Sequence, residues 1–220
     1  MDSTILQVIL GAIVAILITI LVENLRKPRL QLGIDSPPTD VEYQNHPAKY
    51  ARFLSVELAN APLPRWARWM SRNTALQCHG EVTFHHLDGQ NVFGRAMTGR
   101  WSSSPEPVPI TFRIDNHFVL ISDPSKLTSR VDVPPGETQH LNIAARFDSE
   151  SECYGWNNEA YFSDPIWRNP AWCLNSGRYL VKVTIISAGE KCIGLFRLIN
   201  DVSRSDFRLE KTLPNDIVPE

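Results

Sequence analysis

The distribution of apolar and charged residues is most uneven at the start of the chain. Residues 4–22 carry no charge, Asp2 and Glu23 bound the run, and the basic residues Arg26, Lys27 and Arg29 follow it. A helix rises about 1.5 Å per residue, so about 20 such residues cross a hydrocarbon core of about 30 Å. Pro28 cannot continue a helix and should stop it near Lys27. We therefore predict a transmembrane helix with a basic stop over residues 1–27.

The order of charges around this run indicates a retained anchor. A secretory signal has its basic residues before the apolar run and a small-residue cleavage site after it, whereas here an acidic residue precedes the run and the cations follow. Lys and Arg next to a transmembrane end stay on the cytoplasmic side. We expect a single-pass membrane protein with its N-terminus outside and its C-terminal domain in the cytoplasm.

After the anchor, apolar residues alternate with polar ones, which is typical of strands. Alternation or short apolar runs predict strands at residues 29–34, 52–58, 76–87, 118–121, 130–133, 140–147, 179–185 and 192–199, with an edge piece at 207–213. The positions expected to share the inward face of their strand are Leu54, Val56 and Leu58, then Leu76, Cys78, Val82 and Phe84, and then Tyr179, Val181, Val183 and Ile185. Asp88 and Gly89 form a hairpin signal, so a returning strand is expected at residues 90–97. The prediction is an all-β antiparallel sandwich over residues 28–213, preceded by a single transmembrane α-helix and followed by a tail at 214–220.

The segment from Asn175 to Tyr179 resembles the tyrosine corner of immunoglobulin-like and fibronectin-like β-sandwiches. The resemblance implies that the Tyr179 hydroxyl bonds back to the corner backbone. It also implies that Val56 and Val181 stand where antibody domains have cysteines, so the inter-sheet disulfide of those domains is not expected.

Residues 61–73 interrupt the alternation after the second strand. If the first strand leads away from the membrane and the second returns, this segment lies beside the bilayer. Its basic and aromatic residues are Arg65, Trp66, Arg68, Trp69 and Arg72. Trp favours the headgroup layer and Arg attracts anionic lipid. We expect an interfacial foot at the membrane; the alternative is a basic loop whose tryptophans cap the core.

Residues 148–176 form a long stretch without periodicity, expected at the membrane-distal end. Such loops are often functional, and aromatic residues are enriched in protein interfaces. The candidate contacts for a protein partner are Tyr154, Trp156, Tyr161, Trp167 and Trp172. The alternative is an aromatic lid folded over the end of the sandwich.

Composition narrows the function classes. The net charge of −2, with 21% charged residues, does not favour a nucleic-acid surface. The sequence contains no Cys-x-x-Cys pair, phosphate-binding loop or nucleophile-elbow motif, so we predict neither a metal nor a cofactor. His85 and His86 are adjacent in a strand and point to opposite faces. Cys153 is the most exposed thiol candidate, whereas Cys78 and Cys192 are expected in the core.

The sequence thus predicts a non-enzymatic, membrane-tethered binding or scaffold module. One alternative is a hydrolase-type enzyme with a site in the 148–173 loop near His85 and His86. Another, if the orientation is reversed, is an extracellular carbohydrate-binding sandwich, in which Cys153 and Cys173 could form a disulfide.

Three small residues, Gly11, Ala15 and Thr19, share one face of the predicted anchor. Small residues at this spacing let two helices approach closely, which predicts a homodimer through the anchor. The alternative is that small residues are simply common in membrane helices.

Overall fold

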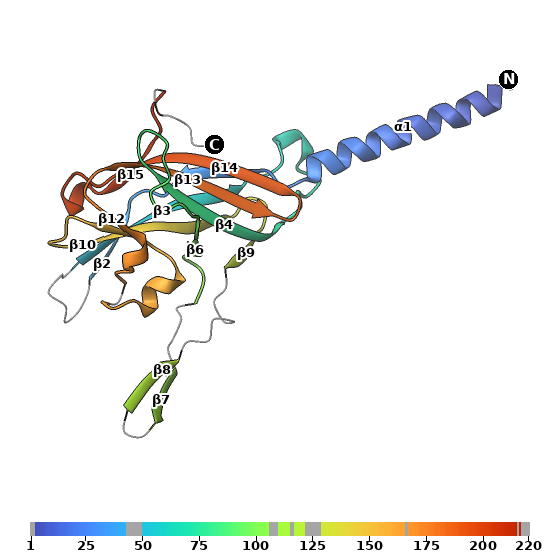
Figure 1. Ribbon diagram of the computed structural model, residues 1–220. Coiled ribbons are helices and arrows are strands. Elements are labelled where there is room, and N and C mark those ends of the chain that lie inside the picture. Colours follow the sequence, from blue (N-terminus) through green and yellow to red (C-terminus); the bar gives the residue numbers. More distant parts are fainter. Residues whose placement is uncertain are drawn as a thin grey trace.

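The computed structural model describes residues 3–42, 50–105, 110–114, 117–121, 129–165, 167–214 and 216. The N-terminal helix α1 (Ser3–Arg26) projects from a β-rich body (Figure 1). It ends one residue before Lys27, as Pro28 predicts. Residues Gln7–Arg26 are long and apolar enough to cross a membrane, and none of this stretch is buried against the rest of the protein.

The body contains two antiparallel sheets. In the seven-stranded sheet the order is β1-β3-β10-β11-β12, with β2 also paired to β3 and β6 to β10. Its strands are β1 (Leu30–Ile34), β2 (Thr39–Glu42), β3 (Tyr50–Asn60), β6 (Arg100–Trp101), β10 (Thr138–Phe147), β11 (Cys153–Gly155) and β12 (Cys173–Leu174).

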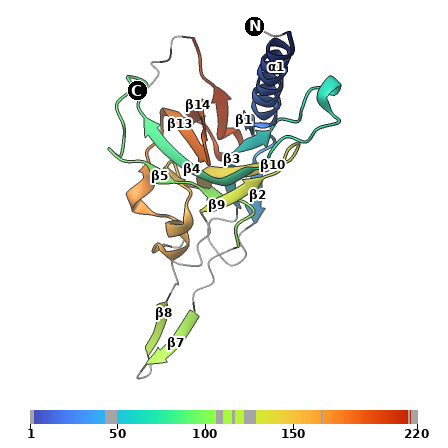
Figure 2. The ribbon, with the colours of Figure 1, turned by 90° about the vertical axis from the view of Figure 1, so that its right-hand side faces the viewer.

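In the six-stranded sheet the order is β15-β14-β13-β4-β5, with β9 paired to β4. Its strands are β4 (Ala75–His85), β5 (Met97–Thr98), β9 (Arg130–Val133), β13 (Arg178–Ser187), β14 (Glu190–Ile199) and β15 (Arg208–Lys211). A separate hairpin, β7 (Ile110–Ile114) with β8 (His117–Ile121), extends away from both sheets (Figures 1 and 2). The short 3-10 helices are η1 (Arg65–Ala67), η3 (Asn158–Phe162), η4 (Pro170–Trp172) and η5 (Arg204–Asp206).

The two large sheets share one apolar core, so the sandwich predicted from alternation is present. The inward positions expected for the second strand and for residues 179–185 are all buried: Leu54, Val56, Leu58, Tyr179, Val181, Val183 and Ile185. The edge piece expected near residues 207–213 forms as β15. Burial of such alternating side chains is the main stabilising contribution of a sandwich.

The start of β4 departs from the predicted alternation. Leu76 was expected to face inward with Cys78, but its side chain is 50% exposed. Gln77 has a φ of 55°, and the β4–β9 pairing shifts register between Ala75 and Cys78. This bulge inserts a residue and turns Leu76 outward, so the inward assignment of Leu76 was wrong.

The strand predicted at residues 90–97 is also largely wrong. The turn itself forms, with Gly89 at φ 90° and its N–H donating to the His86 carbonyl at 2.9 Å. Pairing then continues only as a bridge from His85 to Asn91, because the Asn91 side chain accepts the N–H groups of Phe93 and Gly94. Asn competes for backbone groups in this way, and pairing resumes only at β5.

The hydrogen bond implied by the tyrosine-corner resemblance is present. The Tyr179 hydroxyl donates to the Asn175 carbonyl at 3.0 Å. The same carbonyl accepts from Nδ2 of Asn200, also at 3.0 Å, and the Asn200 side chain is buried. The corner backbone is therefore bonded by Tyr179 in β13 and by Asn200, which directly follows β14.

Candidate functional site

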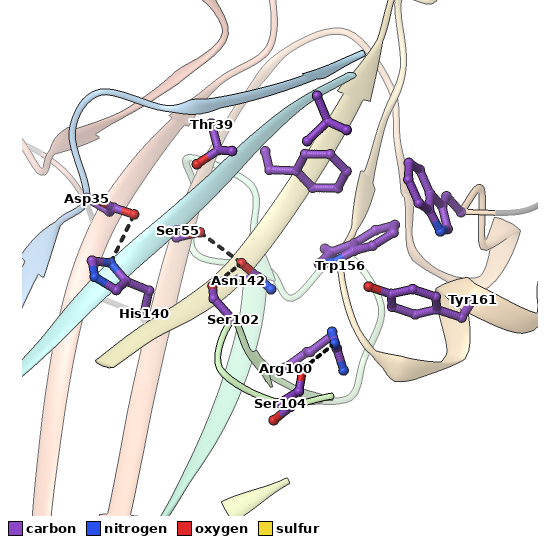
Figure 3. A pocket seen from close by; sticks show the side chains of 13 residues that line it. Asp35, Thr39, Ser55, Arg100, Ser102, Ser104, His140, Asn142, Trp156 and Tyr161 are labelled. Atoms are coloured by element: carbon purple, nitrogen blue, oxygen red, sulfur yellow. Dashed lines mark hydrogen bonds and ion pairs between the residues drawn. The ribbon is translucent and has the colours of Figure 1, made fainter. Parts of the chain in front are cut away.

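A groove of about 470 Å³ lies on the outer face of the seven-stranded sheet (Figure 3). Its floor comes from β3 and β10, one side comes from the β1–β2 connection and β2, and the other comes from β6 and residues 156–167. The floor residues are Phe53, Ser55, His140 and Asn142. They face outward because their neighbours in each strand, such as Leu54 and Leu141, face the core.

The centre of the floor is an amide held by two hydroxyls. Oδ1 of Asn142 accepts hydrogen bonds from Oγ of Ser55 and Oγ of Ser102, both at 2.9 Å. These three residues lie on or beside three different strands, and the Ser55–Asn142 pair is in direct register between β3 and β10. The arrangement directs the amide nitrogen of Asn142 toward the aromatic wall (Figure 3), and no described residue accepts a hydrogen bond from it.

A carboxylate–imidazole pair lies beside this amide. Nδ1 of His140 is 3.0 Å from Oδ2 of Asp35, and the Asp35 backbone N–H donates to the Ser55 carbonyl at 3.2 Å. His140 and Asn142 are two residues apart in β10 and therefore project from the same face. The groove floor thus places the Asp35–His140 pair next to the side-chain amide of Asn142.

The opposite wall is a cluster of aromatic rings. Trp156 packs edge-on against Phe53 at 4.9 Å and against Trp167 at 5.4 Å between ring centroids. Trp167 has a φ of 70°, a left-handed backbone conformation that is rare for a bulky residue, and its N–H donates to the Ala160 carbonyl at 2.7 Å. Backbone strain of this kind gathers at functional sites.

Arg100 joins this wall to the sheet. Its guanidinium donates to the Ser104 carbonyl at 2.8 Å and to Oδ1 of Asn158 at 2.7 Å, and it lies 4.9 Å from the centre of the Tyr161 ring. The side chain is buried. Arg100 therefore links η3 to β6 and the residues that follow it on this side of the groove.

The five aromatic residues expected to contact a partner separate into two groups. Trp156 and Trp172 are each only 3% exposed, although Trp156 still forms part of the groove wall, whereas Tyr161 and Trp167 are partly exposed and line the groove. Tyr154 packs on Phe147, and burial raises its pKa to about 12. Residues 148–165 and 167–176 form short elements along the edge and outer face of the sheet. The segment therefore provides a groove wall, and it does not form the lid over the end of the sandwich that was considered as the alternative.

The thiols are not arranged as nucleophiles. Cys153, expected to be the most exposed, is fully buried, and burial raises its pKa far above the ordinary value; burial also raises the pKa of Cys78 to about 11. Cys153 opposes Leu174 and Cys173 opposes Tyr154 across β11 and β12, so the two cysteines face opposite sides of the sheet. All four cysteines are free, and the bridge considered for a reversed orientation is not formed.

The adjacent histidines have structural partners. Nδ1 of His85 is 3.0 Å from the Gly89 carbonyl and Nε2 is 2.8 Å from Oγ1 of Thr83, so both ring nitrogens of His85 are engaged in closing the turn. His86 lies against the ring of Tyr179. Within the described ranges, no group of three or more His, Cys, Asp and Glu side chains is placed to hold a metal ion.

Residues 61–73 lie beside the base of α1 (Figures 1 and 2). The Asn73 N–H donates to the Arg26 carbonyl at 2.7 Å, and the Arg72 guanidinium donates to the Lys27 carbonyl at 2.6 Å. Trp66 and Trp69 are 67% and 80% exposed. They therefore do not cap the core, and the alternative interpretation of this loop was wrong.

A buried amide, which the sequence did not single out, joins this loop to the end of α1. Oδ1 of Asn60 accepts the N–H of Arg29 at 3.1 Å, and Nδ2 donates to the carbonyls of Asn73 and Val133, both at 3.0 Å. One side chain thus connects the exit of α1, the end of the 61–73 loop and the end of β9.

Four further groove residues could not be expected from the sequence, because isolated polar residues in strands carry no local pattern that marks a site: Ser55, Arg100, Ser102 and Asn142. Comparison with known proteins adds no assignment, since no family model, curated protein or solved structure matches this chain.

Proposed function

We propose that this protein is a single-pass, membrane-anchored binding module whose cytoplasmic β-sandwich presents the groove on its seven-stranded sheet to a ligand. The orientation is supported by the basic residues at the C-terminal end of α1. The exposed Arg65 and Arg68 lie at the same end, so the positive charge around the exit of the helix extends into the folded domain.

The observation that carries the proposal is the held amide of Asn142. Two hydroxyls donate to its oxygen, so its N–H groups face the groove beside the Trp156 and Phe53 rings. The ligand that fits is a molecule or peptide segment with a carbonyl or carboxylate oxygen next to an apolar group. Ligand sites of about 300–1,000 Å³ with an apolar lining and a few convergent polar groups are typical, and the groove has this size and composition.

The same contacts favour binding over hydrolysis. A hydroxyl nucleophile needs a base within hydrogen-bond reach. The Ser55 and Ser102 hydroxyls instead donate to Asn142, and in the described part of the chain neither hydroxyl is hydrogen-bonded to His140. His85, His86 and Cys153, around which the hydrolase alternative was built, are engaged in packing or buried. The strained Trp167 backbone is then a means of holding the wall in a shape suited to a ligand.

The test uses the full chain in lipid nanodiscs with a photo-crosslinking amino acid at Thr39 or Val41, on the β2 rim of the groove, and at Lys191, on the exposed side of β14, as the control. After incubation with cytosolic extract, adducts are identified by mass spectrometry. We expect one reproducible adduct from the rim positions only.

The matched variant is Asn142→Asp. A carboxylate still accepts from Ser55 and Ser102, so the floor keeps its shape, but the N–H donors are lost and an acceptor oxygen is repelled. We expect the rim adduct to disappear. Adducts that are equally abundant at Lys191, or unchanged in the Asn142→Asp variant, would overturn the proposal.

A further inference from the structure

We propose that residues 61–73 are a peripheral lipid-binding foot, which places Trp66 and Trp69 in the headgroup layer and Arg65 and Arg68 against anionic lipid phosphates beside the anchor. This inference concerns a different surface from the groove and does not depend on the ligand proposed there.

The side chains of the loop are divided between the domain and the outside. Leu63 and Ala67 are buried and hold the loop on the sandwich. The Ala67 N–H donates to the Pro64 carbonyl and the Met70 N–H to the Ala67 carbonyl, at 2.9 and 3.0 Å. In such tight turns residues three apart share a face, so Trp66 and Trp69 project together. They are the two most exposed tryptophans in the described part of the chain.

The loop is fixed at the level where α1 ends. Besides the contacts of Arg72 and Asn73, the Ala61 N–H donates to the Arg29 carbonyl at 2.9 Å. The buried Asn60 amide then ties Arg29 to Asn73. If residues 4–22 occupy the hydrocarbon core, residues 26–29 lie at the interface, and the exposed rings are held at the depth that Trp prefers. Continuity with the anchor is what identifies a lipid surface as the occupant.

The three arginines of the loop have different roles. Arg72 is partly buried, bonds the Lys27 carbonyl, and has its pKa lowered by burial and by the nearby Arg29; it holds the loop in place. Arg65 and Arg68 are exposed and form no ion pair with any carboxylate in the described ranges. A polybasic segment near an anionic leaflet gains about 1 kcal/mol per Lys or Arg, so these two provide the preference for anionic lipid.

The experiment measures the depth of the foot directly, because α1 already holds the chain in the membrane. A nitroxide is attached at Ser71→Cys in the full-length protein whose partly exposed native thiols are removed by Cys173→Ala and Cys192→Ala. The labelled protein is reconstituted in nanodiscs of phosphatidylcholine alone or with phosphatidylserine. A second label at Leu87→Cys, on an exposed side chain at the far end of β4, serves as the reference. Collision with a water-soluble nickel reagent and with oxygen reports whether each label faces water or lipid.

We expect the Ser71 label to be shielded from nickel and accessible to oxygen in membranes that contain phosphatidylserine, while the Leu87 label stays in water. Arg65→Glu with Arg68→Glu, or Trp66→Ser with Trp69→Ser, should return the Ser71 label to water. Lys211→Glu, an exposed charge on β15, should change nothing.

Two results would overturn the inference. Equal shielding in phosphatidylcholine alone would remove the requirement for anionic lipid. A Ser71 label that faces water in both membranes would exclude the foot, whatever the groove binds. Because the substituted side chains are exposed, the circular dichroism spectrum of each variant should match that of the parent protein. If the spectrum of a double variant differs, the two single substitutions are measured in its place.

Discussion

The backbone N–H of Arg29 donates to Oδ1 of Asn60 at 3.1 Å, and this bond attaches the segment that follows α1 to the last residue of β3. The Asn60 side chain is fully buried and makes two further hydrogen bonds. The connection between α1 and the domain is therefore a defined joint, which gives the domain a set position relative to the end of α1.

Asn60→Ala should destabilise the protein. The substitution leaves the Arg29 N–H and two carbonyls without their partner, and a buried unsatisfied group costs about 1–3 kcal/mol. Denaturant unfolding of the full chain in detergent measures the change. Asn73→Ala is the control, because the exposed Asn73 contributes only its backbone to the joint, and its effect should stay within about 0.5 kcal/mol.

Leu141 fills a slot that requires two glycines. A Cβ at Gly80 or at Gly99 would lie 2.7 Å from a methyl carbon of Leu141, and Leu141 is fully buried. Gly99→Ala should therefore cost about 1–3 kcal/mol by overpacking. Gly33→Ala in β1 is the control, since a Cβ there meets no atom within 4 Å.

The same slot predicts non-additivity. Leu141→Ala alone leaves a cavity and should cost about 2–5 kcal/mol. In the double variant with Gly99→Ala the new methyl group occupies part of the vacated space, so the loss should be smaller than the sum of the single losses. Strict additivity in the denaturation midpoints would show that Leu141 can move away from the glycine.

Stability should fall between pH 9 and 11, in part through Cys78. Burial raises the pKa of this thiol from 9.0 to about 11. In this window the unfolded thiol loses its proton while the folded one keeps it, so the unfolded state binds fewer protons and the free energy of unfolding decreases as pH rises. Cys78→Ala should reduce the slope, whereas Val82→Ala, a buried truncation without a titrating group, should lower stability and keep the slope.

Tyr179→Phe should cost about 0.5–1.5 kcal/mol, the net contribution of one hydrogen bond. The Asn175 carbonyl keeps its bond from Asn200, so no acceptor is left unpaired and a larger loss is not expected. Tyr154→Phe provides the comparison, because the Tyr154 hydroxyl has no hydrogen-bond partner in the described part of the chain. Equal effects of the two substitutions on thermal unfolding would argue against a stabilising corner.

The proposed orientation has a direct test. In sealed vesicles whose cytoplasmic face is outward, an external protease should digest the sandwich domain without detergent, because the cations after α1 hold that end on the cytoplasmic side. An epitope at the C-terminus reports digestion. Protection of the epitope until detergent is added would place the domain on the other side and contradict the proposed function.

The sequence by itself determined the long apolar helix α1 and most of the large strands. A charge-free run of this length and the alternation at residues 179–185 are local properties, and each predicts the same structure whatever the rest of the chain does. The sequence could also place the tryptophans of residues 61–73 beside the helix. A first strand that leads away from the helix and a second strand that returns bring the loop after the second strand back to the helix end.

Only the tertiary structure decided the groove and the joint. Ser55, Ser102 and Asn142 come together because β3, β10 and β6 pair in one register, and Asn60 meets Arg29 across 31 residues of sequence. The outward position of Leu76 also depends on strand pairing, because the bulge at Gln77 accompanies the register shift between β4 and β9. The contacts of a polar side chain in a strand depend on which residue lies opposite it in the neighbouring strand. Strand pairing joins segments that are distant in the sequence, so the hydrophobic periodicity within one segment does not predict those contacts.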